Sequence, residues 1–309
     1  MGLVYTPADA VYWMAIAHLP NWNRERINIL LEILLKSQFP LSEFFALNSE
    51  EWQNLFHLSE REIESIFSIK KKLPSFFALV EDLYNQGYEM IPVHSKVYSS
   101  HLRETLGKQY APSILYVKGN VSLLNQPSAC LFGSRHSIGR ALIFSHNIVQ
   151  DLVHNQKVII TSYDLGFDRL ILNWCVQAGG KCIVILGEGV LALQYPIDAY
   201  SQYIASRKML FLSTLFPKYK SNQKLMRYRD MLICGFAKDI YIADSSEKRW
   251  IWQWIIQNLK RGYPFYVRIP DKDENNANHL FIANGAIPVN MNGRIFKAVT
   301  SDDGKFTDS

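Results

Sequence analysis

The sequence predicts a doubly wound α/β fold, with a Rossmann-like, mostly parallel sheet and a small all-α domain in front of it. Three observations lead to this prediction. Residues 7–85 show helical patterns without strand alternation. From residue 128 onward, short apolar runs alternate with helical segments. These runs are apolar along their whole length, which is typical of parallel strands covered by helices on both faces.

The first 85 residues are expected to form a cluster of short helices. Apolar residues recur at helical spacing within NWNRERINILLEILLKSQ, at Ile27, Leu30, Leu31, Leu34 and Leu35. Ser42, Ser49 and Ser59 each stand just before a glutamate and mark expected helix starts. We therefore place a helical domain at 1–85.

Residues 86–127 are expected to be a connector that packs onto the α/β domain. They contain one β-rich run, SILYV (113–117), which Gly119-Asn120 closes. The α/β domain follows at 128–292, and the polar tail at 293–309 is expected to fray. The expected strands are 129–132, 157–162, 181–187, 209–214, 239–244 and 264–270, and the expected helices are 138–153, 168–178, 198–207, 222–235 and 247–260.

The stretch LFGSRHSIGR (131–140) leads from a strand into a helix and has the chemistry of a phosphate-binding turn. Gly133 permits close backbone approach, Ser134 carries a hydroxyl, and Arg135 offers a planar fork of donors. Gly139 and Arg140 open a helix, whose free N–H groups favour an anion. With only two glycines, the turn taken alone is compatible with either a phosphate site or a purely structural turn.

Other strand ends and one helix start add to this edge of the sheet. TSYDLGFD (161–168) brings Ser162 and Gly166, and LGEGV (186–190) brings Gly187 and Gly189. KLMRYRDML (224–232) opens a helix with three cations, which form either a solvated basic face or part of the ligand edge: Lys224, Arg227 and Arg229. Asp168 is expected to cap a helix, with service as a base as the alternative.

Taken in order, APSILYVKGN, GSRHSIGR, IITSYDLGFD, GGKCIVILGEGV followed by Tyr195-Pro196, RYRDMLICGF and Gly285-Ala286 resemble the DNA-processing protein A (DprA/Smf) family. The resemblance covers about 90–290. It implies a homodimer that binds single-stranded DNA in the cytoplasm, without catalysis, and helps to load a RecA-type recombinase during natural transformation. It implies that Arg135 and Arg229 contact phosphates, that Arg140 and Lys224 add steering charge, and that the N-terminal domain is SAM-like or helix-hairpin-helix-like.

The chain departs from the family pattern at several positions. Asp164 stands where the family has a small residue, and the family's Arg-Asn-Arg triplet reads Arg229-Asp230-Met231. Like charges at 164 and 230 are expected to oppose a phosphate. Bulky side chains fill KRWIWQWII (248–256), and LPNWN (19–23) and HLSER (57–61) lack the glycines through which helix-hairpin-helix motifs contact DNA. A DNA contact in the N-terminal domain is therefore not expected.

The tryptophans of 248–256 are expected to serve packing more than base stacking. Trp250, Trp254 and Ile255 fit one helical face, which indicates core packing or a protein interface. Trp252 falls off that face and is a candidate partner contact.

Composition excludes several classes of protein. The net charge of +5 over 309 residues permits nucleic-acid binding without requiring it. Four cysteines without a C-x-x-C pair predict reduced thiols in a cytosolic protein, with no metal and no cofactor. No run of 18 apolar residues predicts a membrane span, and no catalytic triad or nucleophile elbow is present.

The leading hypothesis is therefore a single-stranded DNA-binding protein that works with a recombinase. A second hypothesis is a degenerate paralogue that acts as a nucleotide sensor or a protein-interaction scaffold. A third is a nucleotide phosphoribohydrolase like those of the lysine-decarboxylase-like (LOG) group. The P-G-G-x-G-T context of such enzymes is missing here, which ranks the enzyme last.

Overall fold

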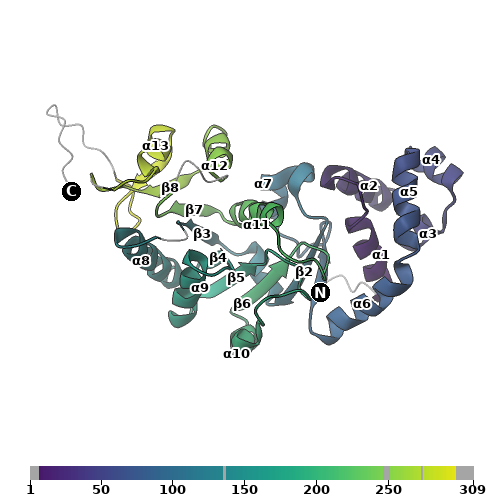
Figure 1. The fold of residues 1–309 in the computed structure, drawn as a ribbon, viewed down its shortest axis with the longest axis horizontal. Helices are drawn as coiled ribbons and strands as arrows, with labels where there is room; N and C mark the ends of the chain where they lie inside the picture. The colour runs from purple at the N-terminus through teal and green to yellow at the C-terminus, as the bar shows by residue number, and fades with distance from the viewer. Residues whose placement is uncertain (1–6, 135–136, 246–250, 273, 297–309) are drawn as a thin grey trace. The chain divides into compact units, whose positions relative to one another are not determined.

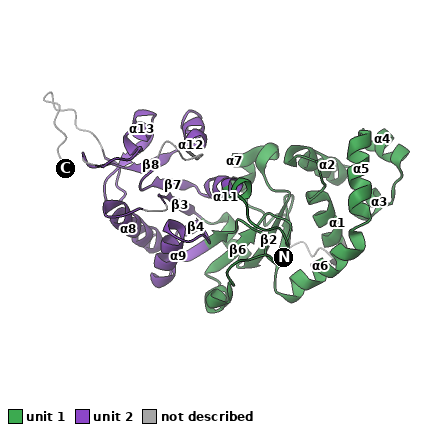
Figure 2. Ribbon diagram, viewed as in Figure 1, with its two compact units in different colours: residues 1–126, 183–226 green, residues 127–182, 227–309 purple. Residues whose placement is uncertain are grey.

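A computed structural model of the chain describes residues 7–134, 137–245, 251–272 and 274–296 (Figure 1). Its contacts divide the chain into two compact units (Figure 2). Unit 1 comprises residues 1–126 and 183–226, and unit 2 comprises residues 127–182 and 227–309. The division of the chain at residues 85 and 127 stays a prediction.

Unit 1 begins with six helices, as the sequence predicted. They are α1 (Pro7–Ala17), α2 (Arg24–Lys36), α3 (Leu41–Ala46), α4 (Ser49–Phe56), α5 (Glu60–Lys70) and α6 (Leu73–Asn85). Ser59 does cap α5, in a capping box with Glu62. Two other expected starts shift by one or two residues: Asn48, rather than Ser49, caps α4, and α3 begins at Leu41 behind Pro40. The side chain of Asn48 accepts a hydrogen bond at the start of α4, and the restricted φ of Pro40 favours a helix start at Leu41.

The sheet of unit 1 contains antiparallel strands. β1 (Glu89–Pro92) pairs antiparallel with β2 (Ile114–Gly119), and β2 pairs antiparallel with β6 (Met209–Ser213). β5 (Lys181–Ile185), which spans the division between the units, neighbours β6. The remaining elements are α7 (Ser100–Tyr110), η1 (Val121–Asn125), η2 (Asp198–Tyr200) and α10 (Ser201–Ala205). The expected connector thus contributes two sheet strands, of which the sequence revealed only the second.

Unit 2 has the predicted parallel sheet. Its strand order is β4 (Val158–Ser162), β3 (Ser128–Phe132), β7 (Asp239–Ile242), β8 (Phe265–Arg268) and β9 (Ile287–Val289). Every pair among them is parallel. The helices are α8 (Arg140–His154), α9 (Phe167–Gln177), α11 (Gln223–Phe236), α12 (Ile251–Leu259) and α13 (Asn278–Ala283), and α11 starts in unit 1.

Burial explains why the strands of unit 2 were readable from the sequence. Every residue of β3 and β4 is buried, so no polar face interrupts the apolar runs. The sequence missed α13 and β9, which are six and three residues long and carry weak patterns. The start of the expected frayed tail is ordered instead, since Val289 forms a bridge with Ile295. Residues 297–309 lie outside the described residues.

Among the described helices, none combines the length and the apolar character needed to cross a bilayer.

Candidate nucleic-acid interface

Three segments of unit 2 reach the same edge of its parallel sheet. The chain leaves β3 for α8 through residues 133–139, and it leaves β4 for α9 through 163–166. Helix α11, of which unit 2 contains the residues from Arg227 onward, leads to the start of the parallel strand β7, so these residues begin at the carboxyl edge. This is the edge at which doubly wound sheets bind ligands.

The β3–α8 turn is closed by a carboxylate that the sequence interpretation overlooked. The backbone N–H of Ser134 donates to Asp244 Oδ1 at 2.5 Å, and Ser137 Oγ donates to the same oxygen at 2.7 Å. Asp244 is the second residue after β7, close to the carboxyl end of a strand, and that position was the available signal. Asp244 therefore occupies the backbone N–H of Ser134, which a phosphate bound in this turn would need as a donor. Arg135 lies outside the described residues.

Gly133 and Gly139, the two glycines of this turn, are required for different structural reasons. A Cβ atom at Gly133 would stand 2.3 Å from the ring of Phe167, so the glycine allows β3 to pass close to α9. Gly139 has φ +53° and precedes α8 without any side-chain cap. Arg140 follows it, 59% exposed, with Nη1 2.9 Å from Asp271 Oδ1. The positive end of the α8 helix dipole therefore lies beside an exposed cation, and no side chain caps it.

The hydroxyl of Ser162 in the β4–α9 segment forms its hydrogen bonds with groups of the same segment. Ser162 Oγ donates to Asp168 Oδ2 at 2.5 Å and accepts the N–H of Asp164 at 3.2 Å. The expected helix cap was wrong: Gly166, with φ +95°, precedes α9, and Asp168 lies in its first turn. Burial raises the pKa of Asp168, while Arg229 opposes the shift. Ser162 thus supports a carboxylate rather than offering its hydroxyl to a ligand.

Arg229 is enclosed by acids. Its Nη1 lies 2.6 Å from Asp164 Oδ2, and its Nη2 donates to Asp230 Oδ1 at 2.6 Å. The side chain is only 6% exposed. Burial lowers the pKa of the guanidinium, but Asp230, Asp164 and Asp168 outweigh it and raise the pKa overall. The side chains that the sequence flagged as opposing a phosphate therefore hold this cation in an internal cluster, which we call the Arg229 cluster (Asp164, Asp168, Arg229 and Asp230).

The remaining candidates separate between the units. Arg227 is exposed on α11 in unit 2, whereas Lys224 belongs to unit 1. Gly187 and Gly189 follow β5 in unit 1, and a Cβ at Gly189 would stand 2.3 Å from the carbonyl oxygens of Phe216 and Pro217. Gly189 thus has a packing role. Among its described residues, unit 2 contains eight of the twelve candidates: Gly133, Ser134, Gly139, Arg140, Ser162, Gly166, Arg227 and Arg229.

The tryptophan segment packs within unit 2. Trp254 meets Phe265 edge-on at 6.3 Å between ring centroids, and Ile255 is buried, which agrees with the expected packing face. The ring centroids of Trp252 and Phe281 lie 4.2 Å apart. The side chain that we expected to contact another protein therefore packs against a residue of its own unit. Trp250 lies outside the described residues.

No group of three or more potential metal ligands occurs within the parts of the chain that the structure describes. The four cysteines are free thiols, and all are buried. The carboxyl edge of the unit 2 sheet offers a ligand the β3–α8 turn, the uncapped amino end of α8 and the exposed Arg140 and Arg227.

Comparison with known proteins places these features in a family. The profile of the family described as "DNA recombination-mediator protein A" matches residues 89–300. The DNA processing protein DprA of Streptococcus pneumoniae (strain ATCC BAA-255 / R6) is 26% identical over 136 residues, which are 44% of this chain and 48% of that protein. The chain thus spans about half the length of that curated relative.

Two solved structures share the fold. The X-ray structure of DprA from Streptococcus pneumoniae superposes with a TM-score of 0.63 at 19% identity, covering 92% of this chain and 95% of that one. A Helicobacter pylori structure, titled for the single-stranded DNA binding mode of DNA processing protein A, gives a TM-score of 0.53 at 21% identity, covering 65% and 90%. The match to the family profile covers more than half of the chain, so this protein belongs to the DNA recombination-mediator protein A family.

Proposed function

We propose that this chain binds single-stranded DNA at the carboxyl edge of the unit 2 sheet and acts in the cytoplasm as a recombination mediator. The observation that carries the proposal is the amino end of α8. It has no side-chain cap, and it stands beside the exposed Arg140 in the turn of the family's Gly-Ser-Arg motif. The similar DNA processing protein of Streptococcus pneumoniae, and the Helicobacter pylori protein with its single-stranded DNA binding mode, support the same ligand.

The roles of the cations differ from those that the resemblance implied. Arg229 is neutralised by its own carboxylates, so we assign it to holding the 164–168 loop against α11. Arg227 is exposed and forms no ion pair with a carboxylate of the described residues, and Arg140 is exposed beside Asp271. We propose these two arginines as phosphate contacts, together with Arg135. The partner recombinase and a homodimer remain part of the proposal.

The test is a fluorescence-anisotropy titration with single-stranded oligonucleotide, double-stranded DNA and free nucleotides at two salt concentrations. We expect single strands to bind best and affinity to fall with salt, because each neutralised phosphate adds about 0.7 to the slope of log affinity against log salt. Arg227→Ala should lower that slope by about 0.7. Arg261→Ala is the matched control, since this exposed residue precedes β8 at the opposite edge of the same sheet.

The protein-interaction scaffold remains the second candidate function, and the Arg229 cluster favours it. Three carboxylates around one buried arginine leave a net negative charge where a phosphate would bind. An absent salt slope, together with equal affinity for Arg227→Ala and wild type, would replace the DNA proposal by the scaffold.

A further inference from the structure

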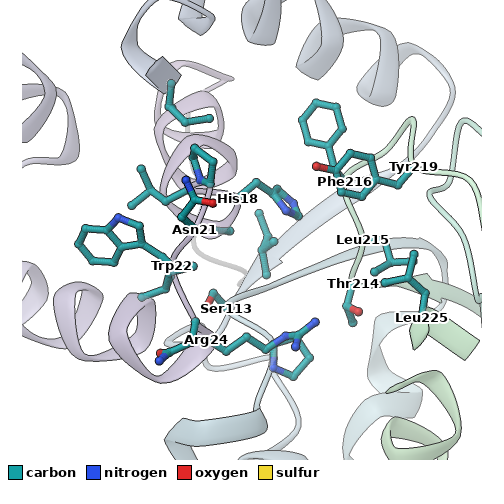
Figure 3. Close-up of a pocket in the computed structure, with 18 of the residues that line it drawn as sticks. His18, Asn21, Trp22, Arg24, Ser113, Thr214, Leu215, Phe216, Tyr219 and Leu225 are labelled. Carbon is teal, nitrogen blue, oxygen red and sulfur yellow. The ribbon is translucent and has the colours of Figure 1, made fainter. Parts of the chain in front are cut away.

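Unit 1 contains a large open cleft, and of the family-like runs only APSILYVKGN reaches it, through residues 112–114. Four segments line it: the α1–α2 connection, the α5–α6 region, residues 109–114 after α7, and residues 214–225 after β6. Its volume is about 1070 Å³, at the upper end of the range for small-molecule sites. Figure 3 shows Trp22 and Arg24 on one side of the cleft and Phe216, Tyr219 and Leu225 on the other. Lys224, which the sequence assigned to the DNA pocket, lines this cleft instead.

The charge of the cleft is strongly one-sided. Its walls carry four cations, Arg24, Lys72, Lys218 and Lys224, against a single acid, Glu25. The three lysines are exposed, and within the described parts of the chain no carboxylate lies within ion-pair distance of any of them. Unpaired cations on the walls of a concave surface focus positive potential and attract an anion. The ligand is therefore expected to carry phosphate or a comparable negative group.

The cleft also offers a fixed aromatic surface. Tyr219 is 56% exposed and packs on Phe216, with ring centroids 5.4 Å apart. Phe216 in turn contacts Phe76 at 5.5 Å and His18 at 5.4 Å. The outer ring of this stack is open while the inner rings hold it in place. An exposed ring on a rigid support is the arrangement on which nucleic-acid bases stack.

Uncharged hydrogen-bonding side chains complete the lining. Asn21, Ser75 and Gln109 are exposed at the cleft and can donate to or accept from base edges. His18 also lines the cleft, and its Nε2 lies 2.9 Å from the hydroxyl of Tyr116. Burial, with a smaller effect of Arg24, lowers the pKa of His18 to about 3, so this side chain is neutral at physiological pH.

We propose that the unit 1 cleft binds a nucleotide unit, with its base stacked on Tyr219 and its phosphate held by Lys72, Lys218 and Lys224. Positive walls, an open aromatic ring and neutral polar groups match the three parts of that ligand. The nucleotide comes either from a single strand of nucleic acid or from the free pool, and the experiment separates these two sources. The proposal does not depend on the unit 2 site.

The first experiment locates the ligand. A short oligothymidylate carrying 5-iododeoxyuridine is irradiated with the full-length protein, and the cross-linked peptide is identified by mass spectrometry. We expect the cross-link in the peptide that contains Tyr219. Tyr219→Ala should lower the affinity of this site about tenfold, the loss of one stacked base, whereas Tyr219→Phe should keep it. Repeating the measurement with Arg227→Ala, which alters only the unit 2 site, keeps the two proposals distinguishable.

The second experiment tests the charges. Lys72→Gln with Lys218→Gln should lower the salt slope of binding by about 0.7, the contribution of the one phosphate that these lysines hold. The matched control is Lys71→Gln with Lys220→Gln, because these exposed lysines neighbour the first pair in sequence and do not line the cleft. Thymidine monophosphate that competes as well as the oligonucleotide identifies the free pool as the source. No cross-link at 214–225, or equal effects of the two lysine pairs, overturns the proposal.

Discussion

Asp164 Oδ2 lies 2.6 Å from Nη1 of Arg229, and this ion pair joins the β4–α9 loop to the middle of α11. In the family pattern that the sequence resembles, the first position is small and the second is a cation for DNA. Here the added carboxylate and the cation meet each other. Asp230 and Asp168 complete the cluster, so the arginine is held by the protein itself.

Asp164→Asn should increase the affinity for single-stranded DNA. Removing this half-exposed carboxylate leaves Arg229 with Asp230 and lowers the negative charge at the edge. We expect a gain of about fivefold at low salt, equivalent to about 1 kcal/mol, that shrinks at high salt. Fluorescence anisotropy measures it. Asp151→Asn makes the same charge change near the far end of α8, and an equal gain there would mean that net charge alone is responsible.

Arg229→Met should destabilise unit 2. The substitution removes a guanidinium that is only 6% exposed and leaves its carboxylates uncompensated. Breaking a buried pair on one side typically costs about 3–5 kcal/mol. The urea midpoint of wild type and variant at pH 7 measures the loss, which should become smaller as the carboxylates protonate in acid. A midpoint that stays unchanged at pH 7 would contradict the cluster's structural role.

Asp168→Asn should stabilise the protein at neutral pH. Burial raises the pKa of Asp168 above its ordinary value of 3.8, so the folded state holds this proton more tightly than the unfolded state. Wild type therefore loses stability as pH rises from about 3.8 through the raised folded pKa. The variant lacks this loss, and its amide oxygen can still accept from Ser162. Urea unfolding from pH 3 to pH 8 should show the two proteins diverging as pH rises.

Gly189→Ala should destabilise unit 1 more than Gly139→Ala destabilises unit 2. At Gly189 a Cβ atom would meet two backbone carbonyl oxygens at 2.3 Å, and backbone cannot move aside as a side chain can. We expect about 3 kcal/mol there. At Gly139 the space is open, and only the positive φ adds a penalty of about 1 kcal/mol. Thermal unfolding of both variants compares them, and the reverse order would contradict the packing role of Gly189.

The sequence located the candidate edge but assigned several of its residues to the wrong partners. Ser162 does end a strand and Asp168 does lie in the first turn of a helix, because those positions follow from apolar periodicity, whereas Arg229 lies in the middle of α11. The hydrogen bond between Ser162 and Asp168, and the electrostatic interaction of Asp168 with Arg229, depend on α9 and α11 folding back to one edge. Likewise Asp244 was counted as part of a strand, although it closes the turn at Ser134 over 110 residues of sequence separation.

The sequence likewise gave no indication of the cleft in unit 1, because residues far apart in the chain line it. Trp22 and Lys224 are more than 200 positions apart, and no local pattern relates them. The glycine-free segment LPNWN gave no reason to expect a ligand there, yet it forms one wall of the cleft.

By itself, the sequence determined the α/β class, the helical beginning, the parallel strands and the family, since each rests on the local order of apolar, glycine and motif residues. Only the tertiary structure decided which charges are available to a ligand. A charge is neutralised or left exposed by neighbours within a few ångströms, and those neighbours come from distant parts of the chain. Arg229 is enclosed for that reason, and Arg227, two residues earlier on the same helix, is exposed.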